Sequence, residues 1–298
     1  MTAIRLSHPP QRHTPFDPYR INVDLHCHSN VSDGVHTPED IAERAHANGV
    51  EWLALTDHDE LGGVARAGKR AAELGMGFIH GVEVSVTWAG ETVHIVGLGV
   101  DIENAALVDG LARTRGGRAG RAQEMADGLA AVGIPGALEG AMKYVGNPSL
   151  ISRSHFARWL VEIGRCDDVR EVFGSYLVEG KPGYVPHRWA RLPEAIGWIR
   201  GAGGVAVIAH PGRYRFTDLE RHAFITEFRD CGGEGIEVLC ASHTPDDARR
   251  AVLAAREFNL KASRGSDFHG AGESRVELGK LGPLPDSVEP IWAQWGIG

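Results

Sequence analysis

Apolar residues recur along the chain in short runs that alternate with longer amphipathic patterns. The runs predict strands at residues 21–26, 51–56, 77–86, 91–99, 203–210, 233–240 and 260–267. Helical patterns follow many of them, over residues 64–74, 193–201, 217–231 and 245–258. Because apolar strands separated by helices are typical of parallel sheets covered on both faces, we expect an α/β fold. A closed (β/α) barrel is the favoured form, and an open doubly wound sheet is the alternative.

The first predicted helix has clear signals at both ends. Thr37 is suited to the N-cap, Pro38 to the first helical position, and two acidic residues follow in the first turn. Gly49, directly after Asn48, ends the pattern. We therefore expect this helix to join the first two strands.

Residues 101–180 interrupt the alternation of strands and helices. Residues 104–132 are rich in Ala, Arg and Leu, and residues 154–164 are amphipathic. We interpret this stretch as a small helical insertion that caps one end of the barrel. The expected organisation is an N-terminal tail (1–20), a barrel (21–100 and 181–285) and the insertion (101–180).

A His-x-His pair stands at the end of the first predicted strand. Val23 and Leu25 indicate a buried strand, and His26 and His28 then project to one face because strand side chains alternate. Asp33 follows after a short polar turn. Two imidazoles and a carboxylate are a ligand set for a divalent metal, although a lone pair of histidines is as often structural.

Further histidines and carboxylates lie within or directly after the other predicted strands. They are Asp57, His58, Asp59, Glu83, His94, His210, Glu237, His243, Asp267 and His269. A carboxylate within an apolar strand, such as Glu83, is costly to bury unless it is paired. Because the carboxyl ends of parallel strands meet at one face of a barrel, these side chains predict a multinuclear metal centre. The remaining histidines are interpreted as structural or surface residues: His36, His46, His80, His187 and His222.

Composition narrows the function classes. The 298 residues carry 39 acidic and 31 basic side chains, a net charge of −8, which argues against a long duplex nucleic acid as partner. The four cysteines form no Cys-x-x-Cys pair, so buried thiols in a reducing compartment are expected. No apolar run reaches the roughly 18–20 residues of a membrane span, and the first twenty residues resemble no secretory signal. We expect a cytoplasmic protein with no membrane partner.

Six motifs resemble, in order, those of the PHP (polymerase and histidinol phosphatase) family. They are HCHSNVSDG, LTDHDELGG, GVEVS, HIVGLG, IAHPGRY and GSDFHG. The resemblance covers most of residues 21–270 and implies a distorted (β/α)7, TIM-like barrel with a trinuclear Mn, Fe or Zn site. ISRSHFARWL and EGKPGYVPH further resemble one branch, nucleoside 3′,5′-bisphosphate phosphatases and 5′-to-3′ exoribonucleases.

The resemblance implies a set of metal ligands. They are His26, His28, Asp33, His58, Glu83, His94, His155, His210, Asp267 and His269. His155 lies in the insertion, so the cap would supply one ligand. Glu83 and Asp267 are the expected bridging carboxylates, and Asp33 or His58 is the candidate acid for the leaving oxygen. Up to three ions are expected, with Mn²⁺ first and Fe or Zn as alternatives.

Substrate contacts are expected from the insertion. Arg118 and Arg121 are three residues apart and share a helix face, while Arg153 and Ser154 adjoin His155. The resemblance supports phosphate and sugar contacts for these four residues, and a solvated helix face is the alternative for the first two. Lys181 and Arg213 are secondary candidates, and the possible base-stacking partners are Trp159, Tyr184 and His243.

The expected activity is hydrolysis of the 3′-phosphate of nucleoside 3′,5′-bisphosphates. A 5′-to-3′ exoribonuclease acting on short 5′-phosphorylated RNA is the first alternative. Histidinol-phosphate phosphatase ranks below it, because that activity does not account for the arginine-rich insertion. A non-catalytic PHP module is a different class, and it predicts eroded ligands. Every motif position here carries a residue that can bind metal.

Overall fold

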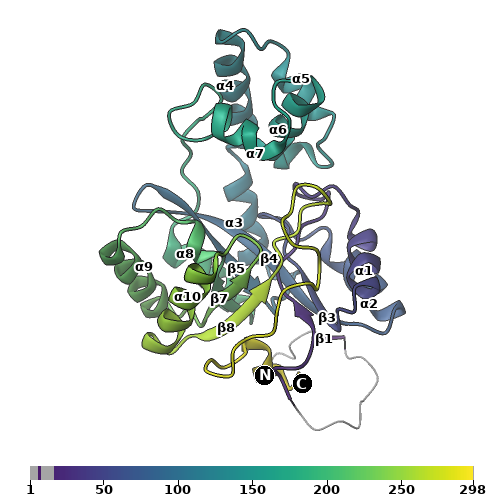
Figure 1. Ribbon diagram of the computed structural model, residues 1–298, viewed down its shortest axis with the longest axis vertical. Helices are drawn as coiled ribbons and strands as arrows, with labels where there is room; N and C mark the ends of the chain where they lie inside the picture. Colours follow the sequence, from purple (N-terminus) through teal and green to yellow (C-terminus); the bar gives the residue numbers. More distant parts are fainter. Residues whose placement is uncertain (1–5, 8–16, 298) are drawn as a thin grey trace.

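The computed structural model describes residues 6–7 and 17–297, and its centre is one curved sheet (Figure 1). Along the sheet the strands are β2 (Val23–Asp24), β3 (Trp52–Leu55), β4 (Gly77–Trp88), β5 (Glu91–Leu98), β6 (Val205–Ile208), β7 (Gly235–Cys240) and β8 (Lys261–Gly265). The short β1 (Leu6–Ser7) pairs with β4. The predicted tail over residues 1–20 otherwise lies mostly outside the described residues.

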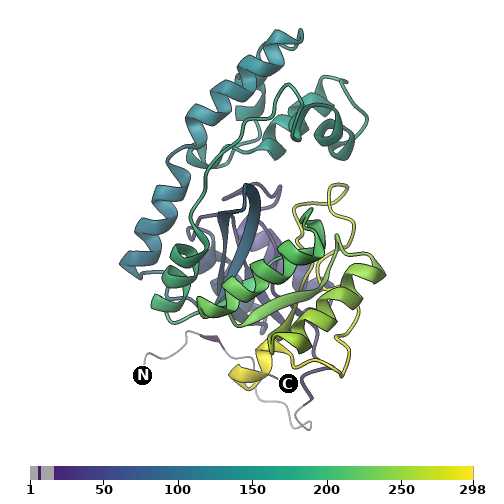
Figure 2. The ribbon, with the colours of Figure 1, turned by 90° about the vertical axis from the view of Figure 1, so that its left-hand side faces the viewer.

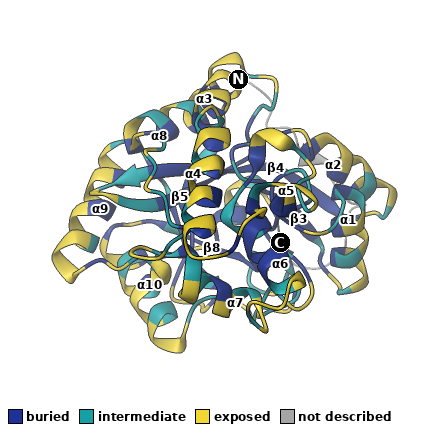
Figure 3. Cartoon of the chain, turned by 90° about the horizontal axis from the view of Figure 1, so that it is seen from above, coloured by how far each residue is buried: buried dark blue, intermediate teal, exposed yellow. Residues whose placement is uncertain are grey.

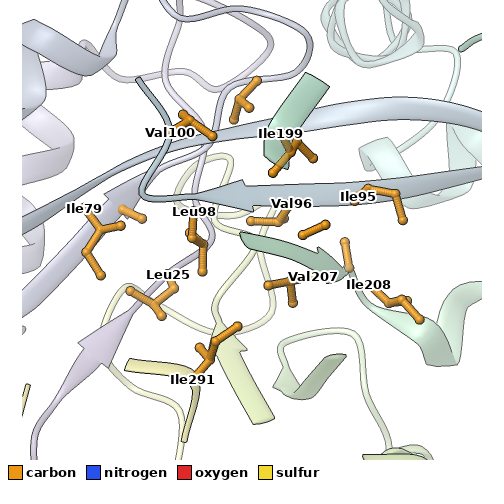
Figure 4. Close-up of a cluster of buried hydrophobic side chains, with 14 of the residues drawn as sticks. Leu25, Ile79, Ile95, Val96, Leu98, Val100, Ile199, Val207, Ile208 and Ile291 are labelled. Carbon is orange, nitrogen blue, oxygen red and sulfur yellow. The ribbon is translucent and has the colours of Figure 1, made fainter. Parts of the chain in front are cut away.

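The sheet closes on itself between its first and last strands. The amide of Leu25 donates to the carbonyl of Arg264 at 3.1 Å, and the amide of Asp267 donates to the carbonyl of His26 at 2.7 Å. Seven strands therefore make a nearly closed barrel, and the expected (β/α)7 architecture is confirmed. Its interior is packed with apolar side chains, among them Leu25, Leu98 and Val207 (Figure 4).

The expectation that all strands run parallel is wrong for β5. This strand is antiparallel to both neighbours, β4 and β6, whereas the other neighbouring pairs along the barrel are parallel. A two-residue turn, Ala89–Gly90, joins β4 directly to β5, and both residues have positive φ (48° and 87°). Such a turn makes a hairpin and leaves no room for a crossover helix.

Helices cover the outside of the barrel (Figure 1). They are α1 (Pro38–Ala47), α2 (Val64–Glu73), α8 (Leu192–Gly201), α9 (Asp218–Asp230) and α10 (Pro245–Glu257), each within two residues of its predicted bounds. The capping signals of α1 are confirmed, since Thr37 and Asp40 form a reciprocal capping box. Within the described residues, no helix has the length and apolarity needed to cross a membrane.

A second group of helices lies above the barrel (Figures 1 and 2). It comprises α4 (Arg118–Ala131), α5 (Ala137–Met142), α6 (Arg153–Glu162) and α7 (Val169–Val172). We call residues 118–177 the helical cap. The cap has a hydrophobic core of its own, which includes Met125, Phe156 and Leu160. Its outward helix faces are exposed, whereas the faces between the helices are buried (Figure 3).

Helix α3 (Ala105–Arg115) leads from the barrel up to the cap (Figure 2). Its apolar residues Leu107 and Leu111 belong to the barrel core rather than to the core of the cap. Gly110 lies against Trp198 of α8, where an added Cβ would be 2.4 Å from the indole ring. Close packing on α8 therefore ties this connecting helix to the barrel.

Candidate metal centre

The end of the barrel beneath the cap collects the histidines and carboxylates singled out in the sequence. His26 and His28 follow β2, His58 follows β3, and Glu83 lies within β4. His94 reaches the site from the middle of β5, opposite Ser85, as expected, but from a strand that is antiparallel to its neighbours and not parallel. The candidate metal centre therefore contains residues from parallel strands and from the antiparallel strand β5.

The remaining residues come from loops and from the cap. His210 follows β6, while Asp267 and His269 follow β8. His210 and Asp267 both have positive φ (27° and 51°), a backbone conformation that is strained for residues with a Cβ. Strain of this kind is found where a surrounding structure holds functional groups in place.

A first group of ligand atoms is formed by His26, His28, Glu83 and Asp267. The Nε2 atoms of the two histidines are 3.1 Å apart, and each lies 3.2 Å from Glu83 Oε2. Asp267 Oδ1 is 3.2 Å from His28 Nε2 and 3.5 Å from His26 Nε2. Four potential ligand atoms therefore converge in a buried space.

Two further groups overlap with the first. In the second, His58 Nδ1 lies 3.0 Å from Glu83 Oε2 and His94 Nδ1 lies 2.8 Å from Glu83 Oε1. The third contains His28, Asp33, His58 and His269, with Asp33 Oδ1 3.3 Å from His269 Nε2. Glu83, His28 and His58 each belong to two groups. The three groups therefore form one continuous cluster.

Several of these atoms are buried without a hydrogen-bond partner among the described residues. They are Asp33 Oδ1, His58 Nδ1, Glu83 Oε2, His94 Nδ1 and His155 Nε2. Buried polar atoms are nearly always paired, and leaving one unpaired costs roughly 1–3 kcal/mol. Nitrogen and carboxylate-oxygen atoms that face one another in this way fit divalent ions of the Mn, Fe or Zn type.

The protonation states at the site differ between the proposed ligands. Burial opposes a charged imidazole, but the neighbouring carboxylates outweigh it, and they raise the pKa of His26 well above its usual range and that of His28 to about 10. Metal binding would therefore release protons from these two histidines.

Burial opposes ionisation of Glu83, but His26, His94 and His58 outweigh it and hold its pKa well below the usual range. Burial lowers the pKa of His210 to about 3 and that of His155 to about 4, so both imidazoles are neutral at pH 7. Neutral imidazoles and ionised carboxylates are the forms that bind metals.

His155 is the residue of the helical cap that was expected to be a metal ligand. Its Nδ1 accepts a hydrogen bond from the amide of Ser152 at 3.0 Å, so the neutral ring carries its hydrogen on Nε2 in this contact. Metal binding through Nε2 would require that hydrogen to leave and the contact with Ser152 to change. The neighbouring hydroxyls of Ser152 and Ser154 donate to Asp33 Oδ2 at 3.2 and 2.9 Å. Arg158 Nη2 donates to the backbone carbonyl of Asp33 at 2.5 Å. The start of α6 therefore contacts Asp33 while Asp33 Oδ1 stays unpaired.

Three arginines of the cap, Arg118, Arg121 and Arg153, lie close enough to one another for their charges to interact. Arg118 forms a buried ion pair with Asp59 (2.5 Å), and the guanidinium groups of Arg118 and Arg121 both lie over the ring of Trp189, at 4.6 and 5.4 Å. Arg153 lies over Phe173 at 5.6 Å. Burial, together with Arg153 and Arg118, lowers the pKa of Arg121 to about 10. Cations this close together repel one another, and a bound anion would relieve that repulsion.

The secondary candidates for substrate contacts and base stacking lie in different parts of the structure. Arg213 is half-exposed and lies 3.0 Å from Asp267 Oδ2, beside the cluster. Lys181 is exposed, and Trp159 is buried in the cap core. His243 Nε2 accepts a hydrogen bond from the amide of Gly212, and its Nδ1 lies 3.1 Å from the carbonyl oxygen of Val238 in β7. Tyr184 is close enough to Arg121 and Arg153 to affect their pKa values.

Some residues at the site were noted in the sequence without a role, or were missed. Glu237 contacts His26, and Ser152 contacts Asp33. A glutamate in the apolar run GIEVLC is the signal for the first, whereas nothing in the sequence distinguishes Ser152. Asp57 accepts hydrogen bonds from the hydroxyls of Ser29 and Ser32 (2.7 and 2.6 Å), so it holds the loop that carries His28.

Comparisons with known proteins agree with this geometry. The model of the PHP domain matches residues 24–129. A Chromobacterium violaceum protein named 3′,5′-nucleoside bisphosphate phosphatase is 50% identical, over 92% of this chain and 96% of its own length. A Haemophilus influenzae protein named 5′-3′ exoribonuclease is 41% identical, over 91% of this chain and 98% of its own length.

Solved structures show the same fold. A Chromobacterium violaceum structure, described as an amidohydrolase with bound sulfate and no metal, has a TM-score of 0.90 at 50% identity, covering 92% of this chain and 96% of that one. A putative metal-dependent phosphoesterase from Bifidobacterium adolescentis has a TM-score of 0.78 at 27% identity, covering 94% and 96%. The chain belongs to the PHP family of metal-dependent phosphoesterases. It is therefore a phosphoric ester hydrolase.

Proposed function

We propose that this protein hydrolyses the 3′-phosphate of nucleoside 3′,5′-bisphosphates, giving a nucleoside 5′-phosphate and inorganic phosphate. The observation that carries the proposal is the continuous cluster of three ligand groups, joined by Glu83, His28 and His58, together with the arginines of the cap, of which Arg118 is buried and Arg121 and Arg153 are half-buried. A substrate with two phosphates needs one site for the reacting group and a second, cationic site for the other. The cluster and the arginines of the cap supply these two sites.

The ions would be held by the barrel and completed by the cap. The proposed ligands are the ten residues His26, His28, Asp33, His58, Glu83, His94, His155, His210, Asp267 and His269. Up to three ions fit the overlapping groups, with Mn²⁺ as the first choice and Fe or Zn as alternatives. When bound, such ions neutralise phosphate oxygens and make water a nucleophile near neutral pH.

The chain's own residues orient the substrate and move a proton. Arg213 would contact the reacting phosphate, and its position 3.0 Å from Asp267 Oδ2 supports this role. Arg153 and Arg121 would bind the 5′-phosphate. Burial and repulsion from neighbouring arginines lower their pKa values, which supports this role because an anion would relieve the repulsion. Asp33 or His58 would donate the proton to the leaving 3′-oxygen.

Arg118 and Ser154 are also proposed substrate contacts, although both have partners within the protein. Arg118 is paired with Asp59, and the hydroxyl of Ser154 donates to Asp33. A substrate contact from either residue would therefore add to an existing hydrogen bond. We further propose that the barrel (21–100 and 181–285) and the insertion (101–180) divide the work between metal binding and substrate choice.

A second candidate activity is 5′-to-3′ exoribonuclease action on short 5′-phosphorylated RNA. The 41% identical relative that carries this name favours it. Both reactions attack the phosphorus on the 3′ side of a nucleoside whose 5′-phosphate is anchored. The two activities would therefore use the same residues and differ in the length of substrate admitted.

The test is a substrate panel assayed with Mn²⁺. Purified protein is incubated with nucleoside 3′,5′-bisphosphate, the 2′,5′ isomer and short RNAs with and without a 5′-phosphate. Release of phosphate from the 3′,5′-bisphosphate, stopped by a chelator, is the expected result. Faster cleavage of 5′-phosphorylated RNA into mononucleotides would favour the second candidate. No hydrolysis of either substrate would refute the proposal.

A further inference from the structure

Glu237 is a buried carboxylate with partners on two different strands of the site. It is 1% exposed. Its Oε1 is 2.7 Å from His26 Nδ1, and its Oε2 accepts a hydrogen bond from the backbone amide of His210 at 2.5 Å. Each of its oxygens is therefore used by a different proposed ligand.

The local structure directs Glu237 toward these partners. The pairing of β7 with β8 shifts register between Glu237 and Leu239, and such bulges redirect side chains near active sites. Gly265 on β8 also matters, because an added Cβ there would lie 2.2 Å from His26 Cβ. The bulge and the missing side chain let His26 and Glu237 meet across β8.

The contact with His26 decides which imidazole nitrogen is free. An ionised carboxylate can only accept, so His26 Nδ1 carries the hydrogen and Nε2 presents its lone pair to the first ligand group. Metal-binding histidines are commonly oriented by a carboxylate in this way.

The contact with His210 replaces a backbone bond that the sheet cannot make. Regular pairing of β6 with β7 ends at Ile208 and Ile236. Two residues later His210 adopts φ 27°, and its amide is satisfied by Glu237 instead of by a strand. The carboxylate therefore holds the strained backbone that carries the His210 imidazole to Glu83, 3.1 Å away.

We propose that Glu237 is a positioning residue that sets two metal ligands at once, and that only a carboxylate can do so. The proposal rests on the metal-dependent function proposed above. Two N–H donors need two acceptor oxygens, whereas a glutamine offers one oxygen and one NH₂ group. In Glu237→Gln, one orientation of the amide opposes the amide of His210, and the other forces the hydrogen of His26 onto Nε2.

The experiment measures Mn²⁺ binding to the full chain by calorimetry, independently of any substrate. Glu237→Gln is expected to weaken at least one Mn²⁺ by about 10- to 100-fold, the usual cost of losing such a partner. The matched control is Glu234→Gln, the same substitution before β7 begins, which is expected to bind as wild type does. Glu237→Asp keeps both oxygens and is expected to bind Mn²⁺ more tightly than Glu237→Gln.

Melting temperatures distinguish a positioning role of Glu237 from a purely structural role. A purely structural role would lower the melting temperature of metal-free and Mn²⁺-loaded protein alike, whereas a positioning role reduces the increase that Mn²⁺ produces. Equal Mn²⁺ affinity in wild type and Glu237→Gln would overturn this inference and leave the proposed function standing. Glu237→Asp binding more weakly than Glu237→Gln would also overturn it. Wild type that binds no Mn²⁺ would overturn both.

Discussion

The barrel and the helical cap contribute to the site in different ways. Proposed ligands from the barrel, such as Glu83 and His28, are fully buried and contact one another directly. The cap reaches the cluster through a few polar side chains at the start of α6, with Asp33 as their main contact. The difference supports the proposal that metal binding depends mainly on the barrel, whereas substrate binding depends on the position of the cap.

Removing the shared carboxylate should have the largest effect on activity. Glu83→Gln keeps the size of the side chain but removes the charge that faces His26, His58 and His94. Because loss of an outer partner costs about 10- to 100-fold, loss of this ligand should lower kcat/KM by more than about 100-fold. Phosphate release and elemental analysis check it. Full activity with a normal metal content would refute the role of Glu83.

Weakening the cap core should separate the two regions. Leu160→Ala removes a fully buried side chain of the cap core and should destabilise that region by about 2–5 kcal/mol. Hydrogen exchange should then accelerate in residues 118–177 but not in β3 or β4, and Mn²⁺ should still bind to the ligands of the barrel. If the strands exchange faster to the same degree, the barrel and the cap unfold as one unit.

Removing the cationic site should change substrate affinity without changing metal content. A charge-assisted hydrogen bond contributes about 1.5–3 kcal/mol, so Arg153→Ala should raise KM for a 3′,5′-bisphosphate by about 10- to 100-fold. Steady-state kinetics check this value. The control is Arg191→Ala, at an exposed arginine paired with Glu194 on α8. An unchanged KM in Arg153→Ala would show that the cap does not bind the 5′-phosphate.

The smallest effect is expected for the contact between the cap and Asp33. Ser154→Ala removes one hydrogen bond to Asp33 Oδ2 but leaves that of Ser152, so activity should fall about 3- to 10-fold. Ser149→Ala, at an exposed serine bonded to Asn147, is the control. Kinetics at saturating and limiting Mn²⁺ are compared. A fall that excess Mn²⁺ does not change would argue for a direct substrate contact by Ser154 instead.

Much of the fold was predictable because local signals agree with the final structure. Thr37 and Gly49 mark the ends of α1 as their chemistry requires. The orientation of β5 was missed because apolar runs look alike in either direction, although the short Ala89–Gly90 link was a usable signal for a hairpin. A crossover helix needs more chain than two residues.

The site was predictable at the level of residue types but not of contacts. A glutamate within an apolar strand, such as Glu83 or Glu237, is visible because burying it unpaired is costly. The approach of Ser152 to Asp33 joins residues 119 positions apart in the sequence and depends on how the cap packs. No local pattern carries that information.

The central claim is that the metals are held mainly by the barrel, with His155 as the one ligand proposed from the cap, and that the cap selects the substrate. It is tested most directly by comparing wild type and Arg153→Ala for hydrolysis of a nucleoside 3′,5′-bisphosphate and of a simple aryl phosphate, both with Mn²⁺. The account predicts that the preference for the bisphosphate falls by about 10-fold or more, while the aryl phosphate rate and bound metal stay unchanged. Equal losses on both substrates, or loss of metal, would contradict it.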